Sequence, residues 1–280
     1  MTSRGAVVPG NATPLAPRDA SLALHGRGAL TIILGLMIVA SLFAVDWSRP
    51  ILHARGLSAL AEMIGAAFRP NLSPDILRAA ARGTVETVAY ATTGVTLAIL
   101  LAFPAGILAA GVLLRGAVPR IVVGGGTRAG LALLRAIHEL IWAWLFVAAI
   151  GLSPAAAVLA LALPYAGILG KVFADMLQDV PEAPLAALRA AGASETKVLL
   201  YGRVPVALPN MVSYGLYRYE CGLRSAAILS FVGLGGLGYQ IQISLDDLRF
   251  DEVWTFVYVL VLLVVLVDSW SAAVRRRMTA

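Results

Sequence analysis

The feature that most constrains this chain is a series of long apolar segments separated by short polar ones. The apolar segments lie at about residues 29–45, 85–114, 131–150, 154–170, 206–232 and 253–267. A membrane-spanning helix needs about 20 mostly apolar residues, so these segments have the right scale to cross a bilayer. A helix also satisfies its own peptide groups inside lipid. The pattern predicts an all-α membrane protein with about six transmembrane helices.

The composition agrees with this class. Hydrophobic residues make up 59% of the 280 residues and charged residues 14%, whereas average soluble domains carry about 25% charged residues. The net charge of +6 would suggest nucleic-acid binding in a soluble protein. Here the basic residues lie mainly between apolar segments, where they orient a chain in the membrane, so we expect no nucleic-acid partner. The single cysteine, Cys221, excludes an internal disulfide and is expected to be a packing residue.

The polar segments suggest a division of the chain. Residues 1–28 are polar and rich in proline, alanine and glycine, which predicts a disordered cytoplasmic tail. Residues 29–45 are expected to be the first transmembrane helix, with a cleaved signal peptide as the alternative interpretation. Residues 46–83 would form an external or interfacial connector, and residues 84–278 the transmembrane core.

The distribution of basic residues predicts the orientation of the chain. With a cytoplasmic N-terminus, thirteen arginines and lysines fall on the cytoplasmic side and six on the other. The last external loop is acidic and contains Asp246, Asp247, Asp251 and Glu252. Because cytoplasmic loops carry an excess of basic residues, we expect both termini to lie in the cytoplasm.

Five charged residues interrupt or border the apolar segments: Arg135, Glu139, Arg218, Glu220 and Arg224. A charge at the centre of a bilayer costs about 2.5–3.5 kcal/mol, so such side chains normally face protein or water. Arg135 with Glu139, and Glu220 with Arg224, have the four-residue spacing that allows pairing on one helix face. Two interpretations remain open. The pairs neutralise one another between packed helices, or the charges line a hydrated pathway for an anionic substrate.

A second motif is the glycine-rich segment of residues 233–238. Gly233, Gly235 and Gly238 fit the spacing G-x-G-x-x-G, and Gly236 adds a fourth glycine. A dinucleotide site needs a strand before these glycines, whereas here they follow an apolar span. We therefore expect the glycines to allow a bend or a close approach of helices.

Signatures of enzymes are missing from the sequence. His138 and Glu139 begin an H-E-x-x-H spelling, but Trp142 occupies the position of the second histidine. The phosphate-binding pattern G-x-x-x-x-G-K-[ST] does not occur either. We expect no metal site, no catalytic residue and no cofactor in this chain, and any ATP and Mg²⁺ would be bound by a partner.

The polar segment of about residues 182–205 is the most informative part of the chain. Between Pro184 and Gly192 the bulky aliphatic residues are Leu185 and Leu188, and alanines make the remaining surface slim. Gly192 is expected to end this helix, and Ser194 to cap a second one. Such a helix–turn–helix can insert into a groove on another protein, or it is an ordinary surface hairpin without a partner.

This segment resembles the EAA loop of ABC-importer permeases. The pattern of that loop is E-A-A, three residues, Gly, nine residues and I-x-L-P. Gly192 and Pro205 match its spacing, and Ala187 stands at the first alanine. Four positions depart from it: Ala186 replaces the glutamate, Leu188 the second alanine, Gly202 the isoleucine and Val204 the leucine.

Residues 187–194, 229–238, 250–253 and 275–277 are similar to the phosphonate-importer (PhnE-like) permease family, and the resemblance extends over roughly residues 77–278. It implies the permease fold of a type I ABC importer in a bacterial-type inner membrane. Two permease chains, identical or different, would form a dimer with the pathway between them. Two cytoplasmic ATPases and an extracytoplasmic solute-binding protein would complete the complex. The implied substrate is a phosphorus oxyanion, namely a phosphonate, phosphate or phosphite.

The resemblance also assigns a role to the loop, because it implies contact with the ATPases. The residues expected to carry this coupling are Ala186, Ala187, Arg189, Ala190, Gly192, Ala193, Ser194 and Pro205. Two alternatives remain: a transporter or channel driven by an ion gradient, with Arg135, Glu139 and Glu220 as an ion relay, and an ABC permease for another solute such as methionine.

Overall fold

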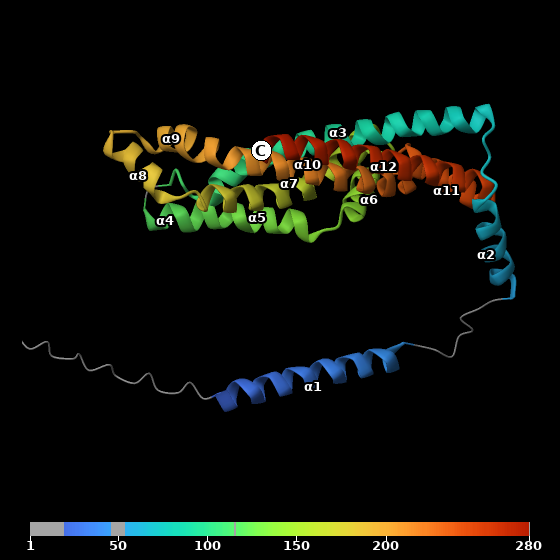
Figure 1. Ribbon diagram of the computed structural model, residues 1–280, viewed down its shortest axis with the longest axis horizontal. Coiled ribbons are helices and arrows are strands. Elements are labelled where there is room, and N and C mark those ends of the chain that lie inside the picture. Colours follow the sequence, from blue (N-terminus) through green and yellow to red (C-terminus); the bar gives the residue numbers. More distant parts are fainter. Residues whose placement is uncertain (1–19, 46–53, 115, 280) are drawn as a thin grey trace, which may run out of the picture. The chain divides into compact units, whose positions relative to one another are not determined.

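The computed structural model describes residues 20–45, 54–114 and 116–279, and these residues contain helices and no strand (Figure 1). Residues 1–19 of the expected tail and residues 46–53 of the expected connector lie outside the described part. The chain divides into two compact units, Met1–Ala59 and Leu60–Ala280.

The first unit contains α1 (Ala20–Ala44), which begins earlier than the expected start of the first span at Ala29. Its apolar part, Gly28–Ala44, is a little shorter than a full membrane crossing. All residues from 28 to 45 are exposed within the chain, as expected for a helix that is surrounded by lipid or by another protein. The next helix, α2 (Ala54–Ala67), continues into the second unit.

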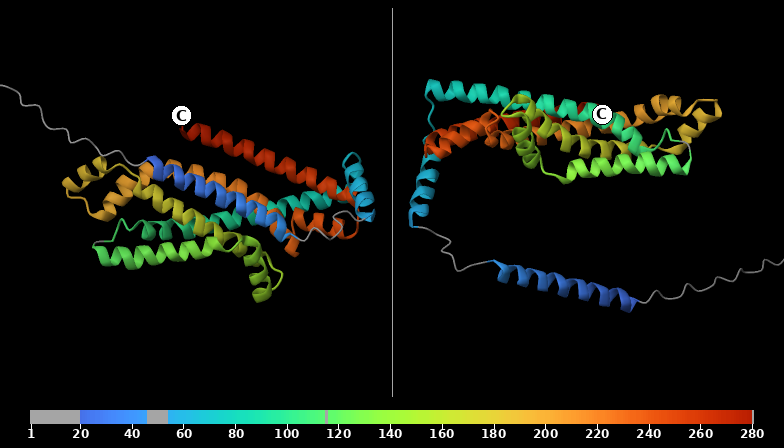
Figure 2. Two further views of the ribbon diagram at one scale, coloured as in Figure 1. Left: turned by 90° about the horizontal axis from the view of Figure 1, so that it is seen from below. Right: turned by 180° about the vertical axis from the view of Figure 1, so that it is seen from behind.

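The second unit is a bundle of helices (Figures 1 and 2). Its main helices are α3 (Pro74–Ala110), α5 (Gly125–Ala136), α6 (Glu139–Ile150), α7 (Pro154–Gln178), α10 (Val204–Leu229), α11 (Leu237–Asp246) and α12 (Phe250–Thr279). The shorter elements are α4 (Ala117–Pro119), η1 (Arg120–Gly124), α8 (Glu182–Ala190), α9 (Glu195–Val198), η2 (Leu199–Arg203) and η3 (Ser230–Val232). We call the end that carries α8 and α9 the loop end, and the opposite end, which carries α11, the glycine end.

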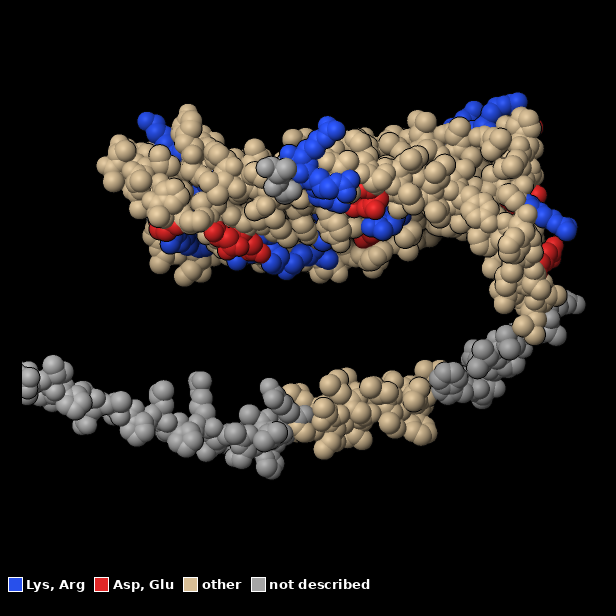
Figure 3. Space-filling model, viewed as in Figure 1, with Lys and Arg blue, Asp and Glu red and all other residues tan. Residues whose placement is uncertain are grey.

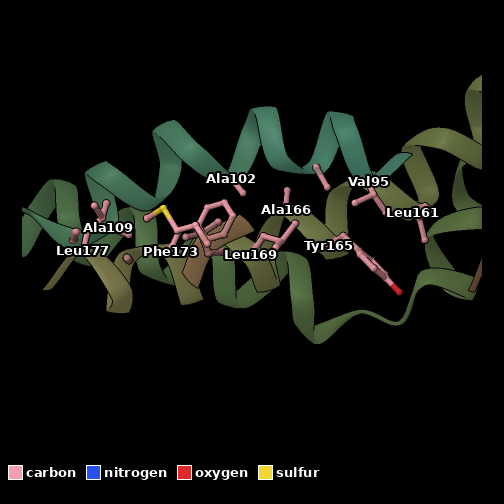
Figure 4. Packing of buried hydrophobic residues seen from close by; sticks show 14 of the residues in the cluster. Val95, Ala102, Ala109, Leu161, Tyr165, Ala166, Leu169, Phe173 and Leu177 are labelled. Atoms are coloured by element: carbon pink, nitrogen blue, oxygen red, sulfur yellow. The ribbon is translucent and has the colours of Figure 1, made fainter. Parts of the chain in front are cut away.

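Helix α7 lies at the centre of the bundle. Two thirds of its apolar window is buried (67%), compared with 6% for α12 at the periphery. Val95, Ala102 and Ala109 of α3 face α7 residues from Leu161 to Leu177 (Figure 4). Lipid tails are as apolar as leucine, so helices in a membrane associate chiefly through such close packing of small residues.

Glycines bring these helices into direct contact. A Cβ added at Gly94 of α3 would lie 2.8 Å from Leu161 Cδ2, and one at Gly167 of α7 would lie 2.7 Å from the carbonyl oxygen of Leu131. The second contact is with backbone, which cannot rotate away as a side chain does. The positions of α3, α7 and α5 relative to one another therefore depend on residues without side chains.

The described residues contain three helices that are long and apolar enough to cross a membrane, or up to five when two bent pairs are counted as one span each. The expected number of six is reached only if α1 also crosses. Helix α3 begins before the expected residue 85 and α7 ends after residue 170, because both helices continue for two or more turns that mix charged and apolar residues. The chain is an all-α protein with several transmembrane helices.

The expected continuous span at residues 131–150 is wrong. Helices α5 and α6 meet at an angle of 88°, and Ile137 between them is extended. His138 Nδ1 accepts a hydrogen bond from the N–H of Leu140 at 3.3 Å and so caps the start of α6. The break contains neither proline nor glycine, so the hydropathy pattern alone did not reveal it.

A tight turn at residues 151–154 joins α6 to α7. Gly151, with φ +77°, ends α6, and Ser153 Oγ accepts a hydrogen bond from the N–H of Ala156 at 3.3 Å at the start of α7. These two caps turn the chain sharply, so that α6 and α7 pack against each other.

We predict that Gly167→Ala destabilises the protein and that Gly130→Ala does not. The new methyl group at residue 167 would collide with α5 backbone, and overpacking of this kind costs about 1–3 kcal/mol. Gly130 lies in α5 with nothing within 4 Å of an added Cβ, so alanine there should improve helix propensity by up to about 1 kcal/mol. Thermal unfolding of the two variants in one detergent measures the difference. Equal melting temperatures would contradict the packing described here.

Candidate functional site

The segment of residues 182–203 forms two short helices at the loop end of the bundle (Figure 1). Helix α8 ends at Ala190, and Gly192, with φ +84°, donates its N–H to the carbonyl oxygen of Arg189 at 2.9 Å. Few residues other than glycine adopt this left-handed conformation without strain. Ser194 occupies the N-cap position of α9, but its side chain makes no capping hydrogen bond, so the predicted side-chain cap is wrong.

The two leucines of α8 point into the protein. Leu185 is fully buried and Leu188 packs against the same core. A Cβ at Gly202 would lie 2.8 Å from Leu185 Cδ2 and 3.0 Å from Leu188 Cδ1. Relative to the EAA pattern, Leu188 is larger than the usual alanine and Gly202 is smaller than the usual isoleucine. The two departures compensate each other in volume.

The opposite face of α8 is slim and open. The small exposed residues of α8 and of the turn after it are Ala183, Ala186, Ala187, Ala190, Ala191, Gly192 and Ser194. Arg189 and Ala193 are half-buried, and Pro205 is exposed at the start of α10. Helix α8 therefore presents mainly small side chains, whereas Lys197, Leu200 and Tyr201 are exposed on α9 and η2.

Arg189 holds the two helices of the loop together. Its guanidinium donates to Glu195 Oε1 at 3.0 Å, to Glu195 Oε2 at 3.3 Å, and to Glu182 Oε1. These carboxylates, Glu195 before Glu182, raise the pKa of Arg189 above its usual value. One side chain thus joins the first turn of α8 to the first turn of α9.

A second arginine attaches the loop to the bundle. Arg203 Nη1 donates to the carbonyl oxygen of Leu177 at 2.6 Å, and Arg203 Nη2 lies 3.8 Å from Glu182 Oε2. Nearby, Gln178 Nε2 donates to the carbonyl oxygen of Ala110 at 2.8 Å. A movement of α8 would therefore be transmitted to the ends of α7 and α10.

The charges within the spans pair differently from the prediction. Glu220 of α10, which is 7% exposed, accepts a hydrogen bond from Arg275 of α12, and Arg275 also donates to Ser271 Oγ at 3.0 Å. Among the described residues no salt bridge joins Glu220 to Arg224. Arg224 Nη2 instead lies 3.7 Å from Cys221 Sγ. The predicted pair within α10 is wrong, because a neighbouring helix supplies the cation.

Arg218 lies between two aromatic rings of its own helix. Its guanidinium carbon is 5.2 Å from the ring centre of Tyr214 and 5.6 Å from that of Tyr217. Two of its nitrogens donate to Tyr214 Oη, at 2.9 and 2.7 Å. Cation–π contact and hydrogen bonds together stabilise a charge that is partly removed from water.

Glu139 belongs to a hydrogen-bonded chain that joins three helices. Ser225 Oγ of α10 donates to Glu139 Oε1 at 2.6 Å, and Tyr165 Oη of α7 lies 3.1 Å from Ser225 Oγ. Arg135 ends α5, before the 88° bend, and no salt bridge joins it to Glu139 in the described part of the chain. The predicted pair of Arg135 with Glu139 is therefore wrong, because the bend removes the shared helix face.

The glycine-rich segment bends the chain by 42° between α10 and α11. Gly233, Gly235 and Gly236 all have positive φ, of +92°, +84° and +89°. At Gly238 an added Cβ would lie 1.9 Å from the carbonyl oxygen of Ala227. The four glycines lie where the chain turns and where backbone approaches backbone.

Two residues of α3 that the sequence analysis did not identify hold this bend. Glu86 Oε2 accepts the N–H of Gly236 at 2.7 Å, and Thr87 Oγ1 accepts the N–H of Leu237 at 3.0 Å. They cap the N-terminus of α11 from another helix, where a carboxylate is favoured by the helix dipole. Glu86 is an acidic residue in an apolar helix, and that signal could have directed attention to it.

The described residues contain no group of three or more histidine, cysteine, aspartate or glutamate side chains that could hold a metal ion. The polar groups of the bundle are instead arranged as helix caps, ion pairs and links between helices.

Comparison with known proteins identifies the family. Residues 94–280 match the model of the family described as "Binding-protein-dependent transport system inner membrane component". The chain belongs to this family. It is therefore a permease, a membrane-spanning transport subunit rather than an enzyme.

Two relatives named as transport permeases are similar over most of this permease. The phosphite transport system permease protein PtxC of Stutzerimonas stutzeri is 33% identical over 89% of this chain and 88% of its own length. The phosphate-import permease protein PhnE of Mycolicibacterium smegmatis is 32% identical over 96% of this chain, which spans about half (48%) of that relative.

Solved structures show the fold. A structure of the MetNI methionine ABC transporter in an inward-facing conformation matches 75% of this permease and all of its own chain, with a TM-score of 0.64 and 21% identity. An amino acid ABC transporter matches 72% of the permease and 94% of its own chain, with a TM-score of 0.61 and 17% identity. The permease thus has the fold of type I ABC importers.

We predict that the ion pair of Glu220 with Arg275 behaves as a coupled unit. Removing one partner of a buried pair leaves an uncompensated charge, at a cost of about 3–5 kcal/mol. Arg275→Gln should be more harmful than Glu220→Gln, because Glu220 is 7% exposed and Arg275 is 25% exposed. The double variant should be less destabilised than the sum of the single variants.

Thermal unfolding of the four proteins of this cycle in one detergent gives the coupling energy. Arg277→Gln is the matched control, because it removes an exposed arginine from the same helix end. Strictly additive effects would contradict a direct interaction of the two residues.

Proposed function

We propose that this permease imports a phosphorus oxyanion, either phosphite, phosphate or a phosphonate, as part of an ATP-driven complex. The observation that carries the proposal is helix α8 with the turn that follows it. Its leucines are turned inward, and its exposed residues from Ala186 to Gly192 are alanine and glycine. A slim helical surface of this kind can enter a groove on another protein. The substrate class is inferred from the solutes named for relatives that are 32–33% identical.

The proposed complex contains two permease chains, two ATPases and a solute-binding protein. The ATPases, which would hold ATP and Mg²⁺, would bind the loop end of the bundle, and the binding protein would dock at the glycine end. Both chain termini would then be cytoplasmic, as the excess of basic residues on that side suggests. The contacts of Arg189 and Arg203 would keep the loop rigid and connected to the bundle, so that closure of the ATPases would move α7 and α10.

Within the loop, we assign contact with the ATPase to the exposed residues Ala186, Ala187 and Ala190, and the turn to Gly192. Arg189 acts as a positioning residue, because its guanidinium is occupied by Glu182 and Glu195. Ala186 stands where the EAA pattern has its glutamate. In this chain α8 therefore offers its partner small apolar side chains rather than a carboxylate.

The charges within the spans have two proposed roles. The Glu220–Arg275 pair and the chain from Glu139 to Tyr165 are proposed to hold helices together. Arg218 and Arg224 remain candidates for the cationic lining of the pathway. Arg224 is the more accessible of the two, since it is exposed within this chain.

We predict that Ala187→Trp separates the permease from its ATPase. The indole would project from an exposed site, so the permease itself should fold and insert, while the widened helix would no longer enter a groove. Ala129→Trp, at an exposed site of α5, is the matched control. Purification from the native membrane in mild detergent, followed by mass spectrometry, measures the ATPase that copurifies. Undiminished ATPase in the Ala187→Trp sample would contradict the assigned contact.

The substrate is tested with the purified complex in proteoliposomes. We expect ATP-dependent uptake of phosphite, phosphate or a phosphonate, with the others as competitors and with methionine ineffective. If methionine alone were taken up with ATP, the proposed substrate class would be wrong, but the assignment of the loop as the ATPase contact would stand. Uptake driven by an ion gradient, from a chain that purifies without an ATPase, would contradict both.

A further inference from the structure

A small basic cavity lies between α5 and α7, outside the features used above. Its volume is about 150 Å³, and it is lined by Arg128, Leu131, Arg135, Lys171, Ala174 and Asp175. Leu131 and Ala174 are buried and form its apolar base, whereas the three basic residues are exposed. Figure 3 shows charged side chains along the edge of the bundle where α5 lies, in contrast to the uncharged surface that covers much of that view.

The protein supplies hydrogen-bond acceptors and a neutralising carboxylate for only some of the basic groups of this cavity. Lys171 Nζ lies 2.6 Å from Asp175 Oδ2. Arg128 donates to the carbonyl oxygen of Ala109 at 2.8 Å and to Gln178 Oε1 at 3.0 Å, both uncharged acceptors. The Arg135 side chain has neither an ion pair nor a hydrogen bond within the described part of the chain. Three cations and one carboxylate leave the site with two positive charges in excess.

The rigidity of the site follows from its surroundings. Gly167 brings α7 so close to α5 that an added Cβ would lie 2.7 Å from the carbonyl oxygen of Leu131 and 3.0 Å from the backbone nitrogen of Arg135. Arg128 is held by its bonds to α3 and to the end of α7. The positions of the basic groups are therefore set by the bundle before any ligand binds.

The position of the site relative to the membrane can be derived from the length of α12. From Val253 to Arg275 this helix rises about 33 Å, which matches a hydrocarbon core of about 30 Å, so Arg275 and its partner Glu220 lie at the membrane edge near the loop end. The Tyr165–Ser225 hydrogen bond aligns α7 with α10. On α10, Glu220 lies five residues from Ser225 toward the loop end. On α7, Lys171 lies six residues from Tyr165 in the same direction. Both displacements are about 8–9 Å along the helix axis. Lys171 therefore lies at the same membrane edge.

We propose that Arg128, Arg135 and Lys171 form a binding site for a phosphate group at the membrane edge of the loop end. A guanidinium presents two parallel N–H groups that match the oxygens of a phosphate, and an ammonium adds a compact charge. Lys171 would exchange its contact with Asp175 for the ligand. At this depth the site can receive the phosphate of an anionic lipid headgroup or a free phosphorus oxyanion that enters or leaves the bundle.

The proposal depends on the membrane fold and not on the transported solute. A negative result in the uptake experiment would therefore leave it unchanged. Conversely, loss of phosphate binding here would not affect the assignment of the α8–α9 loop.

The test is a direct binding measurement on the full-length chain. In one arm, the protein in phosphatidylcholine nanodiscs is titrated with inorganic phosphate at low salt, and calorimetry measures the binding. In the other arm, native mass spectrometry of the delipidated protein measures retention of added phosphatidylglycerol relative to phosphatidylcholine. Each arm compares the unmodified chain with Arg135→Gln, Lys171→Gln and Asp175→Asn. Arg276→Gln is the control, because it removes one exposed basic residue at the end of α12.

We expect Arg135→Gln and Lys171→Gln to weaken binding at least about tenfold, since a hydrogen bond to a charged group is worth about 1.5–3 kcal/mol. Asp175→Asn should strengthen binding, because it removes the competing carboxylate, and this gain cannot result from misfolding. Binding of inorganic phosphate identifies a free ion as a ligand. Selective retention of phosphatidylglycerol without phosphate binding identifies the lipid headgroup.

The proposal is overturned if neither ligand binds. It is also overturned if the affinity for each ligand is the same in the Arg135→Gln, Asp175→Asn and control proteins. A general effect of net charge would weaken binding equally in Arg276→Gln, and that result would also count against a site between α5 and α7.

Discussion

The close approach of α7 to its neighbours is the constraint on which the rest of the structure depends. In lipid, helices gain little from burying apolar surface against one another, so their association relies on van der Waals contact between small residues. Gly94 receives Leu161, and Gly167 lies against the backbone of Leu131. Because α7 touches α3, α5, α6 and α10, its surface determines where the polar groups of four helices can meet.

Polar links are built on this packing and join helices that are distant in sequence. The Glu220–Arg275 pair fastens the outer helix α12 to α10, and Glu86 with Thr87 fastens α11 to α3. At the loop end, Arg189 and Arg203 join α8 and α9 to α7. Within the bundle these links satisfy polar groups that would be costly in hydrocarbon, and at the loop end they fix α8 and α9 to the bundle.

The sequence analysis anticipated the class and the loop because their signals are local. Apolar runs predict helices wherever they occur, and Gly192 ends α8 in a left-handed conformation that its residue type allows. The resemblance to ABC-importer permeases was carried by such local motifs, among them the glycines of residues 233–238. The compensation between Leu188 and Gly202 was not visible, because it depends on a contact between α8 and η2.

The sequence by itself therefore determined the membrane class, the approximate position of the long apolar helices and the turn of the α8–α9 loop, all of which depend on neighbouring residues. Only the tertiary structure decided which charges pair and where helices bend. Glu220 has a candidate partner four residues away, yet it binds Arg275, 55 residues on. Arg135 likewise has a candidate partner four residues away in Glu139, but the bend at Ile137 separates the two residues. Helical spacing shows which residues share a face, whereas the choice of partner depends on which helix packs against that face.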